Sequence, residues 1–272
     1  MSRELFEAMN STRWPKIIPP LTEEQKEISD DFMKYWHEVL PAKYGLVDEF
    51  NHRYPLRHVP PHFRTTLEIG AGLGEHLAYE RLTEDQEKNY VALELRQNMA
   101  EGIQRKFPKV QTRVGDCQTV LDFPSGHFDR ILAIHVLEHL PNLPAAIQEM
   151  HRLCHPAHGT FSVVIPCEGG AAYSLARRVS AQRIFEKRYR QPYGWFIQRE
   201  HINRPAEIQR ELAVYFETVH RSYFPLGLPV VFCNLCIGLT LRPRKVLQTT
   251  RPGPTLRELG PSLRLSANAS PS

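Results

Sequence analysis

Histidine side chains are the best candidates for acid–base chemistry in this sequence. His135 and His139 flank Glu138 in the segment HVLEHL, and a spacing of four residues places both imidazoles on one side of a helix. His201 lies in another polar segment, REHIN, shortly before Asn203, a candidate helix N-cap. Histidine can take up a proton near neutral pH because its ordinary pKa is about 6.5. We expect His139 and His201 to be catalytic, although structural or solvent-exposed imidazoles would give the same pattern.

A glycine-rich segment, LEIGAGLGEH, follows an apolar run and leads into a helical pattern, HLAYERL. Gly70, Gly72 and Gly74 would let the backbone turn sharply and let a ligand approach the main chain. Doubly wound sheets bind their ligands at this place, the carboxyl end of a strand. Plain strand-to-helix turns also contain such glycines.

The spacing of the glycines argues against a dinucleotide. The dinucleotide fingerprint is GxGxxG, whereas this segment reads GxGxG and has Glu75 where the last glycine should stand. A carboxylate at the start of the helix would repel a pyrophosphate. Glu68 adds a second negative charge, which we expect to face the loop. The pattern favours a cationic ligand that carries an amino group.

Two further acids lie at strand ends. Glu94 ends the run VALEL about 20 residues after the loop, and a carboxylate there can accept hydrogen bonds from both hydroxyls of a ribose. Asp116 ends the run TRVGD, where its side chain could accept from an adenine amino group while the Cys117 amide donates to the ring. A solvated strand-end charge and an ordinary turn aspartate are the simpler alternatives.

The elements that must position these residues alternate between apolar runs and helical patterns over residues 63–243, as in a parallel sheet covered on both faces. Seven runs are expected to be strands: TTLEIG, YVALEL, TRVGD, DRILAIH, TFSVVIP, TVHRSYF and LCIGLTL. Residues 1–62 read as a peripheral helical cap, with a capping box at Thr22 and Gln25 and a second helix around Phe50 and Tyr54. Residues 244–272 are rich in Pro, Arg, Ser and Thr, which predicts a disordered tail.

Composition narrows the class of protein. Apolar residues make up 42% of the 272 residues, enough for a large core, and no run reaches the roughly 18 apolar residues that cross a bilayer. We expect a cytoplasmic protein, because the N-terminus lacks a secretory pattern and five scattered cysteines are no disulfide framework. Cys233 and Cys236 are expected to be buried thiols on a strand rather than zinc or redox ligands. The formal charge of +4 does not by itself indicate nucleic acid.

In the order of these motifs, the chain resembles the class I SAM-dependent methyltransferases, in particular the small-molecule branch that includes ubiquinone-biosynthesis-type enzymes (methyltransferase type 11). The resemblance covers about residues 63–243. It is carried by EIGAGLGEH, ALELR, GDCQTVLDFPSGHFDRI and HVLEHLPNLPAAIQEMHRLCHPAHGTFSVVIP. It implies a Rossmann-like, doubly wound α/β fold with a seven-stranded, mostly parallel sheet and helices on both faces. It also implies S-adenosyl-L-methionine (SAM) as the cofactor.

The resemblance also implies roles for individual residues. The first motif would wrap the methionine part of SAM, with Glu68, Gly70, Ala71, Gly72 and Gly74. Glu94 would bind the ribose with Leu95 beside the adenine, and Asp116 and Cys117 would meet the adenine edge. His135 would line the cofactor after the fourth strand. The segment around His201 would lie over the acceptor pocket.

Two other chemistries are disfavoured. HVLEH has the ligand spacing of an inverted zinc-protease motif, but it closes a strand in a methyltransferase-like order, so we predict no metal. Cys167 follows the fifth strand, whereas the nucleophilic cysteine of cytosine-5 methyltransferases follows the fourth. The loop after the fourth strand also lacks an Asn-Pro-Pro-aromatic motif, which disfavours methylation of base amines or glutamine.

An insertion at about residues 168–204 separates the fifth and sixth strands and would form a lid over the acceptor. It combines basic with aromatic side chains: Arg177, Arg178, Arg183, Lys187, Arg188, Arg190 and Arg199 with Phe185, Tyr189, Tyr193, Trp195 and Phe196. Such a lid could hold an anionic small molecule or stack on single-stranded nucleic acid, and solvated arginines on a helix pair would look the same.

The expected reaction is methyl transfer from SAM to an oxygen or nitrogen of a small-molecule acceptor such as a metabolite, lipid or sugar precursor. In-line displacement mainly requires alignment, and a base is needed only where the acceptor must lose a proton. An RNA methyltransferase that uses the arginine-rich insertion and a catalytically inactive SAM-binding subunit are the alternatives. Nucleic acid is the less favoured partner, peripheral membrane contact is left open, and the oligomeric state is not indicated.

Overall fold

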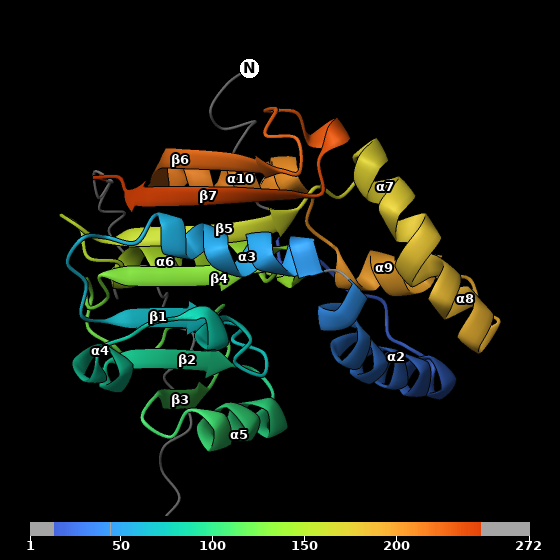
Figure 1. The fold of residues 1–272 in the computed structure, drawn as a ribbon, viewed down its shortest axis with the longest axis horizontal. Helices are drawn as coiled ribbons and strands as arrows, with labels where there is room; N and C mark the ends of the chain where they lie inside the picture. The colour runs from blue at the N-terminus through green and yellow to red at the C-terminus, as the bar shows by residue number, and fades with distance from the viewer. Residues whose placement is uncertain (1–13, 44, 246–272) are drawn as a thin grey trace, which may run out of the picture.

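Seven strands form a single sheet in the computed structural model, which describes residues 14–43 and 45–245 (Figure 1). The strand order is β3-β2-β1-β4-β5-β7-β6. The strands are β1 (Thr66–Ile69), β2 (Tyr90–Glu94), β3 (Gln111–Val114), β4 (Arg130–Ile134), β5 (Thr160–Pro166), β6 (Phe216–Phe224) and β7 (Cys236–Pro243). β1 to β5 are mutually parallel, and β7 runs antiparallel to both β5 and β6. The predicted seven-stranded, mostly parallel sheet is confirmed.

The central strands are buried on both faces, which explains their continuous apolar sequences. Every residue of β1, β2 and β5 is buried. Leu67 pairs with Val91 on one side and Ile131 on the other, so the carboxyl ends of β1, β2 and β4 lie at one edge. That edge holds the glycine loop, Glu94 and the histidine segment.

Helices cover both faces of the sheet, as expected for a doubly wound fold. α3 (Gly45–Arg57) crosses β4, β5 and β7 on one face, in front of the sheet in Figure 1. α6 (Leu143–Leu153) and α10 (Pro205–Tyr215) pack on each other behind it. α4 (Glu84–Lys88) precedes β2, and α5 (Gln97–Lys106) packs against β2 and β3.

The expectation of a peripheral N-terminal cap needs correction for α3. Phe50 and Tyr54 are buried and pack with Val164 of β5 and Cys236 of β7. The sequence pattern shows an amphipathic helix but cannot show what its apolar face covers. α3 is therefore part of the layer that closes the sheet.

The connection after the glycine loop is shorter than predicted. Only a 3₁₀ turn, η1 (His76–Tyr79), follows the loop, where the sequence indicated a longer helix. Directly after it, the Glu80 carboxylate lies 2.8 Å from His76 Nε2 and 2.7 Å from Arg130 Nη1. Arg130 is fully buried, so this polar cluster fixes the chain where a second helical turn would begin.

The remaining helices form a separate lobe beside the carboxyl edge of the sheet (Figure 1). α2 (Glu23–Lys43) starts with the predicted capping box, in which the Gln25 amide donates to Thr22 Oγ1. The insertion folds into α7 (Ala171–Arg177), a π-helical segment η3 (Arg178–Gln182), α8 (Arg183–Tyr189) and α9 (Gly194–Glu200). Phe32 of α2 packs edge-on against Phe185 and Phe196, with ring centroids 5.0 and 5.2 Å away.

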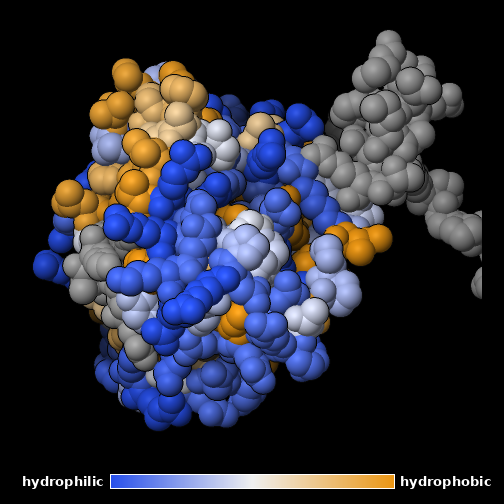
Figure 2. Space-filling model, turned by 90° about the vertical axis from the view of Figure 1, so that its right-hand side faces the viewer, coloured by the Kyte–Doolittle hydropathy of each residue, from blue (hydrophilic) through white to orange (hydrophobic). Residues whose placement is uncertain are grey.

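The surface of this lobe is mainly hydrophilic. Figure 2 shows hydrophobic side chains gathered in the upper part of this face, over α7 and the connection between β6 and β7. No described helix is long and apolar enough to cross a membrane. The predicted tail lies outside the described residues apart from Arg244 and Lys245, and so do the first 13 residues of the expected cap.

Candidate functional site

The glycine loop turns directly at the end of β1. Gly70 and Gly72 have φ angles of +63° and +60°, which L side chains rarely adopt. A Cβ on Gly70 would lie 2.5 Å from the Val136 side chain, and one on Gly72 would lie 2.6 Å from Glu75 Oε2. Gly74 is buried, and Phe107 would lie 2.8 Å from its Cβ. Gly70 and Gly72 therefore form the accessible part of the loop, while Gly74 allows close packing behind it.

Glu94 is bound to this loop. Its carboxylate accepts hydrogen bonds from the Gly72 amide (3.1 Å) and the Arg96 amide (3.1 Å), and the side chain is buried. Ala71 donates its amide to the Leu93 carbonyl (3.1 Å). Leu95, the residue expected beside the adenine, is 65% exposed. The structure thus joins the first two predicted motifs into one surface of backbone, carboxylate and apolar side chain.

The segment around Asp116 lies next to the end of β2, where Glu94 is located. The Gly115 amide donates to the Glu94 carbonyl (3.1 Å), which places Asp116 beside the end of β2. The Asp116 carboxylate accepts from the Gln118 amide (2.9 Å). Burial raises the pKa of the Cys117 thiol to about 12, so any contact with a ring would use its backbone amide and not a thiolate.

Glu68 does not present the negative charge predicted for it. The side chain is buried, and Oε2 accepts a hydrogen bond from the Tyr90 hydroxyl (2.7 Å). Burial raises the pKa of Glu68 to about 8, so the carboxyl is largely protonated at neutral pH. Glu68 lies on β1 as predicted, but burial in the sheet removes the negative charge that would favour a cationic ligand.

His135 and Val136 directly follow β4, and their side chains contact different parts of the structure. His135 has a φ of +54°; its Nδ1 lies 3.0 Å from Glu138 Oε1 and its Nε2 lies 4.0 Å from Cys236 Sγ. Burial opposes the charge, but contacts with Cys236 and Glu138 raise the pKa of His135 to about 10. Val136 is the residue whose side chain abuts Gly70. Val136 therefore borders the glycine loop, and the predicted contact of His135 with the cofactor stays a prediction.

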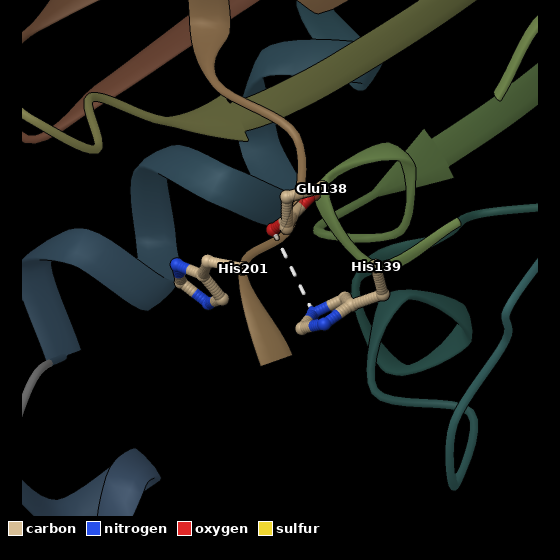
Figure 3. Close-up of side chains that lie close together, drawn as sticks. All are labelled: Glu138, His139 and His201. Atoms are coloured by element: carbon tan, nitrogen blue, oxygen red, sulfur yellow. Dashed lines mark ion pairs between the residues drawn. The ribbon is translucent and has the colours of Figure 1, made fainter. Parts of the chain in front are cut away.

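His139 and His201 come together although they are 62 positions apart in the sequence. Figure 3 shows Glu138, on the turn η2 (Leu137–His139), with both imidazoles below it. The two rings are edge-on with centroids 5.2 Å apart. Glu138, His139 and His201 each offer one atom that could bind a metal ion, and these three atoms lie within 4.8 Å of one another. The structure therefore brings together the two predicted catalytic histidines and adds Glu138.

Each histidine is oriented through Nδ1. His139 Nδ1 lies 2.5 Å from the Glu200 carbonyl, and His201 Nδ1 lies 3.0 Å from Glu168 Oε2. Since a carbonyl can only accept, Nδ1 of His139 carries the proton and Nε2 is the basic nitrogen. Glu168 is itself held by an ion pair with Arg177.

His139 and Glu138 both have lowered pKa values, which leaves one neutral and the other charged at physiological pH. Burial lowers the pKa of His139, and the nearby His201 adds to this effect while Glu138 opposes it. Burial works against ionisation of Glu138, but the hydrogen bond from His135 and the neighbouring histidines lower its pKa to about 2. The cluster therefore pairs a fixed carboxylate with an imidazole that is neutral at physiological pH. Two histidines and a carboxylate are also the donors of many divalent-cation sites.

Asn203 has a different role from the predicted helix cap. Its side chain is buried and donates to the carbonyls of Leu137 (2.8 Å) and Leu140 (2.8 Å), while Arg204 occupies the cap position of α10. The Asn203 amide donates to the Glu138 carbonyl (3.0 Å). Asn203 thus ties the end of the insertion to η2. No local sequence pattern indicates this contact or the role of Glu168.

Three of the five aromatic residues in the predicted lid are buried, and Tyr189 and Trp195 are partly exposed. Phe185, Tyr193 and Phe196 are buried in a cluster with Phe32 of α2. Buried rings cannot stack on the bases of a single-stranded nucleic acid. The basic side chains at Arg178, Arg183 and Lys187 remain exposed.

All five cysteines are free thiols. Cys236 is buried on β7 as predicted, whereas Cys233 is partly exposed in the turn η4 (Val231–Cys233). The CxxC pair thus divides between a strand and a turn.

Residues 67–161 match the family model of the methyltransferase domain. This segment contains the glycine loop, Glu94, Asp116 and the Glu138–His139 pair. Residues 67–161 are therefore a methyltransferase domain, and SAM is the cosubstrate that such a domain implies.

Solved structures with a similar fold are distant in sequence. A TehB-like SAM-dependent methyltransferase from Corynebacterium glutamicum is 15% identical with a TM-score of 0.50, over 79% of this chain and 98% of that one. A possible histamine N-methyltransferase from Thermotoga maritima is 17% identical with a TM-score of 0.51, over 79% and 98%. A protein from Pyrococcus horikoshii is 14% identical with a TM-score of 0.52, over 78% and 99%. No curated protein sequence matches the chain significantly.

Proposed function

We propose that this protein transfers a methyl group from SAM to an oxygen or nitrogen of a small-molecule acceptor. The acceptor would bind between η2 and the insertion, beside His139 and His201. The cofactor would bind along the glycine loop and the ends of β2 and β3, with Glu94 toward the ribose and Leu95 and Asp116 toward the adenine.

The observation that carries this proposal is that the glycine loop with Glu94 lies beside the cluster of Glu138, His139 and His201, at one edge of the sheet. The Gly72 amide is bonded to Glu94, and Gly70 adjoins Val136, which is followed within three residues by Glu138 and His139. A narrow backbone turn and a buried carboxylate thus lead directly to a pair of partly buried imidazoles. Doubly wound sheets bind ligands at this edge.

SAM, when bound, supplies an electrophilic methyl group on a sulfonium. The protein must then hold the acceptor in line and, for a hydroxyl, remove its proton. We assign the removal of this proton to His139 Nε2. Nδ1 is engaged with the Glu200 carbonyl, and the lowered pKa of His139 keeps the ring neutral and able to accept a proton. Glu138 would stabilise the imidazolium that forms, and Glu168 would orient His201.

Cofactor binding tests the first half of this proposal. Isothermal calorimetry with S-adenosylhomocysteine should show binding to the native chain. Glu94→Ala should lower the affinity at least tenfold, because it removes a charge-assisted hydrogen bond that contributes on the order of 1.5 kcal/mol or more. Glu101→Ala, an exposed carboxylate on α5, is the matched control and should bind normally. Equal affinity in both variants would contradict the assignment of Glu94.

Methyl incorporation tests the second half. Labelled SAM is incubated with fractionated metabolites, lipids and RNA, and label in a small-molecule or lipid fraction supports the proposal. Label in RNA alone would favour an RNA methyltransferase. Binding of S-adenosylhomocysteine without transfer to any fraction would favour an inactive SAM-binding subunit.

A further inference from the structure

The connection between β6 and β7 exposes an unusual number of apolar side chains. Residues 225–233 read PLGLPVVFC, and four of them project into solvent. The exposed fractions are 58% for Leu226, 54% for Leu228, 47% for Val230 and 66% for Phe232. Contiguous exposed apolar surface on a chain is a mark of an interaction site, whereas scattered apolar residues are not.

The connection is held in one conformation although its tip is apolar. Asn234 is fully buried, and its side chain donates to the carbonyls of Leu228 (2.9 Å) and Val230 (2.8 Å). Its Oδ1 accepts from the Leu226 amide (2.9 Å). The backbone polar groups are thus satisfied from inside, and the apolar side chains are fixed outward.

α7 extends this surface. Its N-cap, Gly170, lies against the connection, since a Cβ there would be 2.5 Å from the Val231 carbonyl oxygen. Leu175 on α7 and Val179 at the start of η3 are 62% and 63% exposed and lie four residues apart along the continuous helical segment. Six of the twelve large apolar side chains that are exposed in the described chain therefore lie on the connection, α7 and the start of η3. They correspond to the hydrophobic area at the top of Figure 2.

Basic residues follow on the same helical segment. Arg178, Arg183 and Lys187 are exposed on η3 and α8, and Glu186 is the exposed acid among them. An apolar tip with an adjoining cationic stretch complements a bilayer of anionic lipids, because apolar side chains enter the acyl boundary while arginine and lysine meet the phosphates. A protein partner would need no such order of apolar tip and basic flank.

We propose that the β6–β7 connection and α7 form a docking surface for an anionic lipid bilayer. Leu226, Leu228, Val230 and Phe232 insert into the membrane, and Arg178, Arg183 and Lys187 contact its headgroups. Glu168, which orients His201, lies two residues before Gly170. Docking therefore holds the candidate acceptor site at the membrane surface, which suits an amphiphilic acceptor.

Flotation of the full chain with lipid vesicles tests this proposal without reference to methyl transfer. The chain should float with vesicles of phosphatidylcholine mixed with phosphatidylglycerol and bind much more weakly to phosphatidylcholine alone. Leu228→Ser combined with Phe232→Ser should weaken binding roughly tenfold or more. Arg178→Gln combined with Arg183→Gln should weaken it and reduce its dependence on salt. Val214→Ser, an exposed apolar residue on α10, is the control and should bind normally.

Two results would overturn the proposal. One is the absence of binding to anionic vesicles, or binding that neither double variant changes while circular dichroism shows every variant folded. The other is self-association in sedimentation velocity that Leu228→Ser with Phe232→Ser abolishes, since a second copy of the chain would then be the occupant. Loss of vesicle binding with unchanged affinity for S-adenosylhomocysteine would support the docking surface independently of the catalytic proposal.

Discussion

The ring of Tyr54 on α3 occupies the space that a side chain at Gly238 on β7 would need. A Cβ on Gly238 would lie 2.5 Å from the ring, and Tyr54 Oη lies 3.1 Å from Thr240 Oγ1 on the same strand. The helix can rest directly on the sheet only because β7 has glycine at this position. This contact makes α3 a layer of the fold.

Gly238→Ala should therefore destabilise the protein by roughly 1–3 kcal/mol, because Tyr54 must leave its position or the helix must move. The measurement is urea unfolding followed by circular dichroism. Gly194→Ala is the control: a Cβ there meets nothing within 4 Å, so alanine in α9 should be neutral or slightly stabilising. A neutral Gly238→Ala would mean that α3 is loosely packed.

The raised pKa of Glu68 predicts a pH-dependent effect on stability. The folded pKa of about 8 lies above the ordinary value of 4.5, so the contribution of Glu68 is complete below pH 4.5 and is lost as the pH rises through 8. Glu68→Gln mimics the protonated carboxyl and can still accept from Tyr90. It should raise stability at pH 8 on the order of 1–3 kcal/mol and change little at pH 4.5.

Glu68→Gln also tests the electrostatic role first expected for this residue. If the carboxyl is neutral, affinity for S-adenosylhomocysteine should stay within about twofold of the native chain, well under the 1.4 kcal/mol of a tenfold change. Glu101→Gln on α5 serves as the comparison for both measurements. A large loss of affinity in Glu68→Gln would restore the charge-based interpretation.

The buried pair of Glu80 and Arg130 should dominate acid sensitivity. Burial opposes ionisation, but His76 and Arg130 lower the pKa of Glu80 to about 2, so its stabilisation is present above pH 4.5 and is lost as the pH falls toward 2. Glu80→Gln leaves Arg130 uncompensated and should cost about 3 kcal/mol at pH 7. Unfolding curves should converge with the native chain near pH 2. Glu84→Gln, an exposed carboxylate, should behave like the native chain throughout.

Gly72→Val should abolish cofactor binding without unfolding the protein. The branched side chain would meet Glu75 Oε2 and require a φ of +60°, so the loop beside Glu94 must rearrange. Gly227→Val is a matched control, because Gly227 also has a positive φ of +69° but lies in the β6–β7 connection with open space around it. Both variants carry backbone strain, and calorimetry should show binding only in Gly227→Val. Normal binding by Gly72→Val would make the loop assignment wrong.

His139→Gln should lower the rate with a hydroxyl acceptor by roughly 10²–10⁴ while leaving affinity for S-adenosylhomocysteine unchanged. Because the pKa of His139 is lowered from 6.5, the acidic limb of the pH–rate profile should lie below pH 6.5 in the native enzyme. The charged and titratable groups that face His139 are Glu138, His201 and Glu200. His158→Gln, far from the cluster, should retain the native rate and profile. Loss of activity on chelation, restored by a divalent ion, would instead make these side chains metal ligands.

The strands, the glycine loop and the strand-end acids could be predicted from the sequence because each depends on a local pattern. Buried parallel strands need continuous apolar runs, the loop needs glycine for its turns, and acids at strand ends meet at one edge. His139 and His201 were singled out by residue type, by the spacing in HVLEHL and by the resemblance to the family. Their partners Glu168 and Asn203 gave no local signal.

The sequence by itself determined the class of fold and the position of the glycine loop, and it singled out His139 and His201 as candidates. Only the tertiary structure decided that Glu68 is buried and protonated, that His135 turns toward Cys236, and that α3 closes the sheet. These outcomes depend on burial and on contacts between distant segments: Tyr54 and Thr240 are 186 positions apart, and His201 and Glu168 are 33. Periodicity reports which face of an element is apolar, whereas the protonation state and partners of a side chain are set by what packs against it.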